Sequence, residues 1–233
     1  KVLDMNEVCP ITHFTEEQQK RWPNLHNSLI GELELPTADE IPPDALATLN
    51  NDVNEMLRKQ LEHSKRDRSR EKLFVFLKQI LEYRFPGSKL DKFGSSVTGL
   101  SLAQGDIDLC LQIPGKVPHK VFNKIGKLLR LHDFVDIVVI PHAKVPIVKC
   151  RDGKTGIPLD ISVNNTLALQ NTQLLKTYSM QDSRVSQAIL AIKHWAMCRD
   201  VSDAPSGTLS SYSWSILSIQ SMQMSSPPLV ANV

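Results

Sequence analysis

FGSSVTGLSLAQGDIDLCL, residues 93–111, joins a turn of small residues to two aspartates that enter an apolar run. Gly94-Ser95-Ser96 follows a short strand-like run that ends at Phe93, and a short helical segment comes after it. At such a strand-to-helix junction, backbone N–H groups and a hydroxyl bind phosphate. Asp106 and Asp108 lie two residues apart, so in a strand both side chains project from the same face. The stretch therefore predicts a phosphate-binding turn followed by a pair of carboxylates.

A third aspartate extends this pattern further along the chain. Asp160 stands between Leu159 and Ile161, and strand alternation turns it away from the face of its apolar neighbours. If the strand at 157–163 lies beside the strand at 107–113, three carboxylates converge. Like charges this close destabilise a fold unless a cation neutralises them, and carboxylate oxygens suit Mg²⁺ or Mn²⁺. Three carboxylates can hold two such ions, the arrangement used for in-line phosphoryl displacement.

Each of these features alone has a simpler structural explanation. An Asp-x-Asp pair is common in proteins without a catalytic role, and Asp160 alone is compatible with a turn cap or an ion pair with a lysine. The order of phosphate-binding turn, paired carboxylates and third carboxylate, each on a suitable element, favours a functional site.

The spacing of apolar residues predicts the elements around this stretch. Apolar steps of three and four predict helices at 44–63, at 70–84 and from Pro118 onward, and helical structure after Asn164. β-rich runs predict strands at 107–113, 134–140, 145–150 and 157–163, with a hairpin loop at 151–156. The layout predicts an α+β unit followed by an all-helical region.

Charge and hydropathy limit the classes of partner. The 233 residues carry a net charge of +2, which by itself does not indicate a nucleic-acid partner, so such binding must depend on a local site. The basic run at 64–70 fits a solvated surface or a contact with a phosphate backbone. No apolar run reaches the length of a membrane span, so we expect no membrane partner.

The cysteines are widely spaced and include no CxxC pair: Cys9, Cys110, Cys150 and Cys198. This usage is typical of reduced thiols in an intracellular protein, and it leaves the cytoplasm and the mitochondrion both open. Alternatively, Cys9, His13 and His26 belong to a zinc site, although the usual paired spacing of zinc ligands is missing.

Together the motifs resemble the DNA polymerase β-like nucleotidyltransferase superfamily. The match consists of Gly94-Ser95, ten further residues, Asp106-Ile107-Asp108-Leu109, and then Leu159-Asp160-Ile161. The stretches DISVNNTLALQNTQLLKTY, AIKHWAM and SGTLSSYSW resemble the branch of non-canonical poly(A) polymerases and terminal uridylyltransferases, in the order of that branch. The resemblance covers about Phe74–Val233. It implies a nucleotidyltransferase domain, with a mixed sheet and flanking helices, followed by a helical domain.

The resemblance also implies a division into domains. We expect the catalytic nucleotidyltransferase domain at 69–165 and the start of the helical, poly(A) polymerase-associated domain at 166–233. The helix and basic linker at 44–68 are expected to pack with the helical domain, while residues 1–43 are not assigned. The family continues with more helices after a Pro-Pro pair, so we expect the helical domain to be incomplete at its C-terminal end.

The resemblance assigns roles to the residues around the opening stretch. It implies that Asp106, Asp108 and Asp160 bind two Mg²⁺ or Mn²⁺ ions and form the catalytic group. Asp160 would also activate the 3′-OH of the RNA. Gly94 and Ser95 would hold the β- and γ-phosphates of a nucleoside triphosphate.

Further along, the resemblance implies contacts with the sugar and base of the nucleotide. Asn165 would read the ribose hydroxyls, which favours ribonucleotides because the 2′-OH distinguishes them. Asn171 and Thr172 would lie near the base edge and the sugar. Taken alone, Asn171 and Thr172 fit the exposed surface of a helix equally well.

The resemblance implies that Lys193 and Ser211 contact the phosphates and that Tyr212 stacks on the base. Each side chain again has a structural alternative. Lys193 alone fits an exposed helix position, and Tyr212 alone fits a core or boundary aromatic. Trp195 fits core packing better than base stacking, because it lies on the apolar stripe of its helix.

The function implied by the resemblance is template-independent addition of nucleotides to an RNA 3′ end, with release of pyrophosphate. UTP is the expected substrate, since GTLSSY and QNT look closest to uridylyltransferases. ATP is the alternative, because the loop that reads the base is expected beyond Val233. Where the branch often carries a second lysine, this chain has Met197, with Arg199 as a candidate substitute. A rival of another class is a non-catalytic RNA- or protein-binding module, which the three aspartates disfavour; protein partners are not indicated.

Overall fold

The computed structural model of the chain describes residues 41–62, 67–102, 105–225 and 227–231. The chain divides into two compact units, 1–50 and 51–233, and the fold below is that of the second. Helix α4 (Pro43–Glu62) contains the boundary between them. The candidate zinc ligands at positions 9, 13 and 26 lie outside the described residues, as do residues 64–66 of the basic run.

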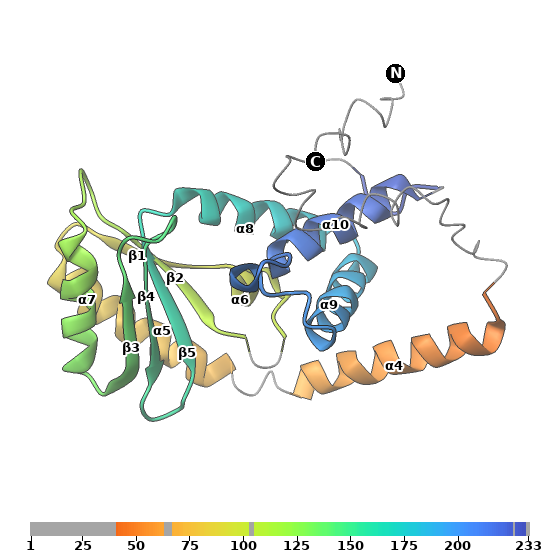
Figure 1. Cartoon of the computed structure of the whole chain (residues 1–233), viewed down its shortest axis with the longest axis horizontal. Coiled ribbons are helices and arrows are strands. Elements are labelled where there is room, and N and C mark those ends of the chain that lie inside the picture. The colour runs from red at the N-terminus through yellow and green to blue at the C-terminus, as the bar shows by residue number, and fades with distance from the viewer. Residues whose placement is uncertain (1–40, 63–66, 103–104, 226, 232–233) are drawn as a thin grey trace, which may run out of the picture. The chain divides into compact units, whose positions relative to one another are not determined.

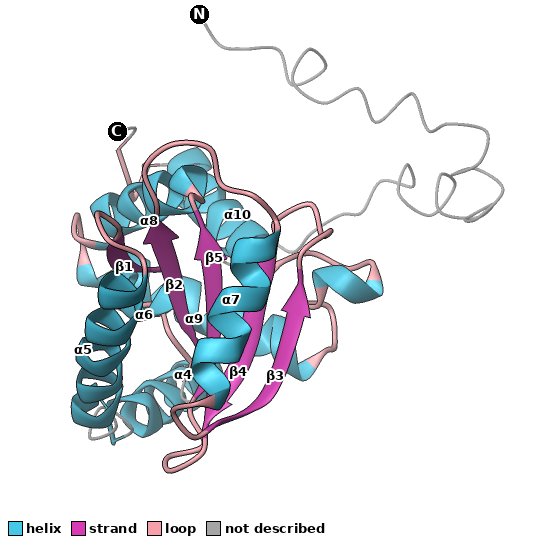
Figure 2. Cartoon of the chain, turned by 90° about the vertical axis from the view of Figure 1, so that its left-hand side faces the viewer, coloured by secondary structure: helices cyan, strands magenta, loops and turns pink. Residues whose placement is uncertain are grey.

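A five-stranded mixed sheet forms the centre of this unit, in the order β1-β2-β5-β4-β3 (Figure 2). Its strands are β1 (Lys89–Phe93), β2 (Ile107–Gln112), β3 (Phe134–Ile140), β4 (Ile147–Asp152) and β5 (Pro158–Val163). β2 and β5 pair in parallel, and the other neighbouring strands pair in antiparallel fashion. Two segments that lie far apart in sequence therefore become neighbours at the centre of the sheet.

The predicted strands agree with the observed ones to within one residue, except at β4. The sequence predicts a strand at 145–150, whereas β4 runs from Ile147 to Asp152. Pro146 lies before the strand, since a proline has no N–H to donate to a ladder. The N–H of Asp152 donates to the carbonyl of Ile157 at 3.0 Å, which extends the pairing into the predicted hairpin loop.

Helices α5 (Asp67–Arg84) and α7 (Lys120–Arg130) pack on one face of the sheet. Their inward residues join strand residues in one apolar cluster, whose fully buried members include Leu77, Leu81, Leu109, Ile125, Leu159 and Ile161. Strand residues alternate between faces, so Asp108 and Asp160 point away from these two helices. The carboxylates are thereby directed toward the helices that follow the sheet.

The remaining helices are α6 (Ser95–Thr98), α8 (Thr166–Ser179), α9 (Ser183–Cys198) and α10 (Ser211–Met224), with a 3₁₀ turn at Ala204–Ser206. Figure 1 shows α8, α9 and α10 grouped around α6. They share a second apolar cluster, formed by Leu100, Leu175, Tyr178, Val185, Ile189, Leu190, Ile219 and Val230. Met56 and Leu57 of α4 pack against this cluster. Within the described ranges, no helix has the length and apolarity that crossing a membrane requires.

The prediction of a core position for Trp195 is wrong. Its side chain is 50% exposed and meets Trp214 edge to face, with the ring centroids 5.7 Å apart. The buried stripe of α9 includes Ile189, Lys193 and Ala196. The position before Ala196 therefore falls at the edge of the stripe rather than on it.

Candidate active site

Three aspartates meet where β2 and β5 run side by side. The parallel pairing sets Asp108 opposite Asp160, and Asp106 immediately precedes the first residue of β2. One carboxylate oxygen of each aspartate lies within 4.8 Å of those of the other two. The convergence predicted from strand alternation is confirmed.

The aspartates repel one another in this partly buried position. Burial, followed by the charges of Asp106 and Asp160, raises the pKa of Asp108 to about 7, against the opposing effect of Lys149 and Lys193. Burial also raises the pKa of Asp160, although its hydrogen bond with Lys149 acts in the other direction. Carboxylates whose ionised form is disfavoured gain stability from a bound cation, and hard oxygen ligands suit Mg²⁺ and Mn²⁺. The donor set and its charge therefore fit a divalent metal site.

Lys149 of β4 brings a positive charge to this group. It is the sheet partner of Asp160, and its Nζ donates a hydrogen bond to Asp160 Oδ2 at 2.7 Å. This hydrogen bond is the main reason why the pKa of Lys149 is raised. The ion pair considered above as the structural alternative for Asp160 is thus present together with the carboxylate group.

The turn at Gly94 approaches Asp108 so closely that no side chain fits between them. Gly94 has a φ of +71°, and a Cβ at this position would collide with Oδ2 of Asp108. The Gly94 N–H donates to Thr172 Oγ1 at 2.8 Å, and Thr172 in turn donates to the carbonyl of Ala168 at 2.7 Å. Thr172 is buried and connects the turn to α8, so the exposed position considered for it is wrong.

A cavity of about 370 Å³ lies between this turn, the aspartates and helices α8 to α10. Its wall includes every predicted nucleotide-binding residue except Asn165: Gly94, Ser95, Asn171, Thr172, Lys193, Ser211 and Tyr212. Asp106 and Asp108 line the same cavity. Sequence reasoning missed the other wall residues, because small or apolar side chains carry no chemical signal: Phe93, Thr98, Leu100, Ala168, Leu175 and Ser215.

Asn165 is not among the residues that line the cavity in the described part of the chain. It is the N-cap of α8, where its Oδ1 accepts a hydrogen bond from the N–H of Ala168 at 3.3 Å. The preceding Asn164, with a φ of +52°, uses its side chain to bond both the N–H and the carbonyl of Ile113. Local structure accounts for both asparagines, and a ribose contact by Asn165 stays a prediction.

Lys193 is a buried residue of the cavity wall, so the exposed position considered for it is wrong. Only 5% of the residue is exposed, and its Nζ donates to the carbonyl of Leu100. Burial lowers the pKa of Lys193 to about 8, although Asp108 and Asp106 act in the opposite direction. The chain thus places a second cation beside the aspartates.

Tyr212 and Ser211 reach the cavity from the first turn of α10. Ser210 caps this helix by accepting a hydrogen bond from the N–H of Ser213 at 3.1 Å, which fixes the turn that carries both residues. Tyr212 is 38% exposed while lining the cavity, so it is not a core aromatic. Its ring is accessible to a planar ligand.

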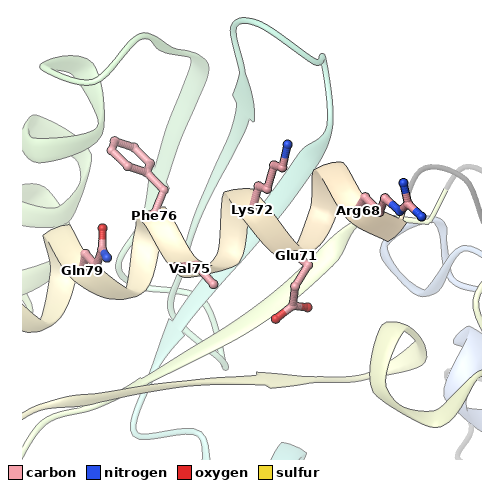
Figure 3. A pocket seen from close by; sticks show the side chains of 6 residues that line it. All are labelled: Arg68, Glu71, Lys72, Val75, Phe76 and Gln79. Carbon is pink, nitrogen blue, oxygen red and sulfur yellow. The ribbon is translucent and has the colours of Figure 1, made fainter.

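A second depression, of about 490 Å³, runs along the outer side of α5 (Figure 3). The described residues of its wall all belong to that helix: Arg68, Glu71, Lys72, Val75, Phe76 and Gln79. Glu71 is the single carboxylate among these described residues. Among the residues that the structure describes, the three-carboxylate group suited to a metal ion is that of Asp106, Asp108 and Asp160. The cavity beside these aspartates is therefore the candidate active site.

Several RNA nucleotidyltransferases are similar to this chain. Terminal uridylyltransferase 7 of Homo sapiens is 36% identical over 171 residues, which cover 70% of this chain and 11% of that protein. Poly(A) RNA polymerase GLD2 of Mus musculus is 29% identical over 252 residues, which cover 98% of this chain and 52% of that protein. A structure of the Cid1 RNA terminal uridylyl transferase matches with a TM-score of 0.70 at 27% identity, over 79% of this chain and 56% of that chain. This chain thus spans about half, or less, of the length of these relatives.

A family model covers more than half of the chain. The model described as the central palm domain of Poly(A) RNA polymerase, mitochondrial-like, matches residues 49–180. This range contains the turn at Gly94 and all three aspartates of the site. The mixed sheet with flanking helices is also the fold of the Cid1 structure, so the predicted polymerase β-like fold is confirmed. The chain therefore belongs to the family defined by the central palm domain of mitochondrial-like poly(A) RNA polymerases.

Proposed function

We propose that the protein is a template-independent RNA 3′-end nucleotidyltransferase, which adds UMP from UTP and releases pyrophosphate. One observation carries the proposal. Asp106 and Asp108 line the same cavity as Gly94 and Ser95, and Asp160 lies beside the two aspartates. A group that binds metal ions and a turn suited to phosphate are what nucleotidyl transfer requires. The relatives named above support this class of reaction.

The three aspartates are proposed to form the catalytic group. Asp106, Asp108 and Asp160 would hold two Mg²⁺ or Mn²⁺ ions. When bound there, such ions lower the pKa of an attacking hydroxyl and neutralise charge on the phosphates. We assign to Asp160 the acceptance of the proton from the RNA 3′-OH. Because burial raises its pKa, Asp160 is a stronger base than an ordinary aspartate.

The other polar side chains of the cavity are proposed to bind the nucleoside triphosphate. The hydroxyls of Ser95 and Ser211 and the ammonium group of Lys193 are donors for phosphate oxygens. The accessible ring of Tyr212 offers a face on which a base can stack. Asn171 lines the same wall and can both donate to and accept from the base edge or the sugar.

UTP is proposed as the substrate, with ATP as the alternative. The GTLSSY and QNT stretches resemble uridylyltransferases, and two of the relatives named above are terminal uridylyltransferases. A third is a poly(A) polymerase, which keeps adenylyl transfer as the second candidate. The two nucleotides differ in the base, so the choice depends on groups that meet the base edge.

The test is extension of a short 5′-labelled RNA by the full-length protein with Mg²⁺ and each of the four nucleoside triphosphates in turn. We expect extension with UTP above all, and no extension by the Asp108→Asn variant. Asp136→Asn is the matched control, since Asp136 is an exposed aspartate on β3 and asparagine tolerates its φ of 52°. Extension with ATP alone would show that the substrate is ATP and not UTP. Absence of extension by a protein that still binds the RNA would contradict the enzyme and favour a binding module.

A further inference from the structure

Arg70, in the first turn of α5, reaches the backbone next to Asp106. Its guanidinium donates from Nη1 to the carbonyl of Asp106 at 3.4 Å and from Nη2 to the carbonyl of Gly105. A guanidinium presents its donors in a fixed planar fork, so two adjacent carbonyls held by one arginine are fixed in position and in orientation. The sequence motifs do not point to this residue, which lies 36 positions before Asp106.

Asp106 has particular need of such support. The pairing of β2 with its neighbours begins at Ile107 with β5 and at Asp108 with β1, so Asp106 precedes the ladder that fixes the rest of the strand. The N–H of Gly105, just before it, donates to the carbonyl of Leu102 at 2.9 Å. This hydrogen bond does not fix the position of Gly105 and Asp106 relative to Asp108.

Two cationic side chains donate to backbone carbonyls that lie close to Asp106 in the sequence. Lys193 of α9 donates to the carbonyl of Leu100, and Arg70 of α5 donates to the carbonyls of Gly105 and Asp106. Both cations therefore act on the backbone that carries the first aspartate of the group. The two helices lie on either side of Asp106 in the sequence.

We propose that Arg70 is the positioning residue of the metal group: it holds the backbone of Asp106 so that the Asp106 carboxylate meets those of Asp108 and Asp160. This inference rests on the proposed function only in assigning a metal to the three aspartates. Arg70 does not touch substrate or metal in this role. Its contribution is geometric, because the carboxylate oxygens stand within 4.8 Å of one another only while Asp106 stays in place. Outer groups of this kind change metal affinity by about 10- to 100-fold when removed.

The experiment uses the full-length protein with Arg70→Met, which keeps the length of the stem but removes all five donors. Arg70→Lys keeps the charge and can still donate to a carbonyl, but not as a planar fork. Arg68→Met is the matched control, since Arg68 stands half a turn earlier on α5 and faces the outer depression (Figure 3). Mn²⁺ binding is measured by electron paramagnetic resonance without RNA or nucleotide, and the unfolding temperature is measured alongside it. Asp106→Ala gives the reference for complete loss of the Asp106 ligand.

We expect Arg70→Met to weaken Mn²⁺ binding by about 10- to 100-fold and Arg70→Lys to recover part of that loss. The expected effect on extension is a lower kcat and a higher Mg²⁺ requirement, with the KM for UTP unchanged. Arg68→Met should resemble the wild-type protein in Mn²⁺ affinity and in RNA extension. If Arg70→Met does not fold, the comparison of Arg70→Lys with Arg68→Met decides the question.

The inference is overturned if a folded Arg70 variant binds Mn²⁺ as tightly as the wild type. It is also overturned if Arg68→Met loses as much affinity as Arg70→Met, or if the wild-type protein binds no Mn²⁺. A wild-type protein that binds Mn²⁺ in an Arg70-dependent manner but extends no RNA contradicts the proposed function and leaves the positioning role of Arg70 standing. The two failures can therefore be told apart.

Discussion

The ammonium group of Lys149 lies 2.7 Å from a carboxylate oxygen of Asp160, across the pairing of β4 with β5. Asp160 is also one of the three carboxylates that fit a divalent metal ion. A side-chain cation therefore already engages a ligand that the metal ion would use. The lysine side chain is half exposed, so it can leave Asp160 for solvent without a large desolvation cost.

We predict that Lys149→Met increases the affinity of the site for divalent cations. Removing the ammonium group removes both a competitor for Asp160 and a repulsive charge. The expected gain is about fivefold in Mn²⁺ affinity, the equivalent of the ~1 kcal/mol typical of a partly exposed ion pair. Titration with Mn²⁺ measures it, and Lys154→Met, at an exposed turn position, is the control. Weaker binding in Lys149→Met would instead indicate that the lysine orients Asp160 for the metal.

A substitution at Gly94 should abolish activity, because the new side chain would displace the Asp108 carboxylate. Gly94 and Gly99 both have a positive φ, +71° and +76°, but their ψ values are −154° and 6°, and a Cβ at Gly99 meets nothing within 4 Å. Gly99→Ala should lose about 1–2 kcal/mol of unfolding free energy, the cost of the left-handed conformation. Gly94→Ala should lose up to about 3 kcal/mol from strain, because its φ and ψ lie in a region that is essentially limited to glycine. Only Gly94→Ala also displaces the Asp108 carboxylate. Urea unfolding and RNA extension measure the two effects separately, and equal loss of extension in both variants would contradict this explanation.

Strand periodicity was sufficient to predict the central part of the fold and of the site. The alternation around Asp108 and Asp160 determines the face of each carboxylate. Nothing in the sequence required β2 and β5 to be parallel neighbours, which the structure shows. Ser95 and Tyr212 could be placed from the resemblance, since both belong to contiguous motifs. These features depend on local sequence.

The contacts that support the site could not be predicted, because they join residues far apart in the sequence. Thr172 accepts from the N–H of Gly94 across 78 positions, and Arg70 reaches Gly105 across 35. The partner of Lys149 depends on the register of β4, which the sequence placed two residues too early. The wrong position of Trp195 has a similar cause, since an apolar stripe gives the buried side of a helix but not its width.

Loss of the aromatic ring at Tyr212 should weaken nucleotide binding more than it slows the chemical step. The ring lines the cavity and is 38% exposed, so a base can stack on it. Stacking of about 1–3 kcal/mol corresponds to a rise of about 5- to 150-fold in the KM for UTP in Tyr212→Ala. Tyr212→Phe keeps the ring and should stay near the wild-type KM. Tyr83→Ala is the control, since that ring is 88% exposed on α5; an unchanged KM in Tyr212→Ala would exclude stacking on this residue.

In the absence of metal ions, ionisation of Asp108 should destabilise the fold as pH rises from about 4 to 7. Burial and the neighbouring carboxylates raise the pKa of Asp108 from 3.8 to about 7, so in this range the folded state binds a proton that the unfolded state has released. The free energy of unfolding therefore falls with increasing pH, by on the order of 1–4 kcal/mol from this group.

The Asp108→Asn variant cannot ionise at this position and therefore lacks this decrease. Urea unfolding of the wild type and of Asp108→Asn in EDTA at several pH values measures the difference between their unfolding free energies. The contributions of Lys193 and other groups largely cancel in this difference. Saturating Mg²⁺ should reduce the decrease in the wild type, because a bound cation favours the ionised carboxylate. Parallel pH profiles for the two proteins in EDTA would show that Asp108 keeps an ordinary pKa in the folded state.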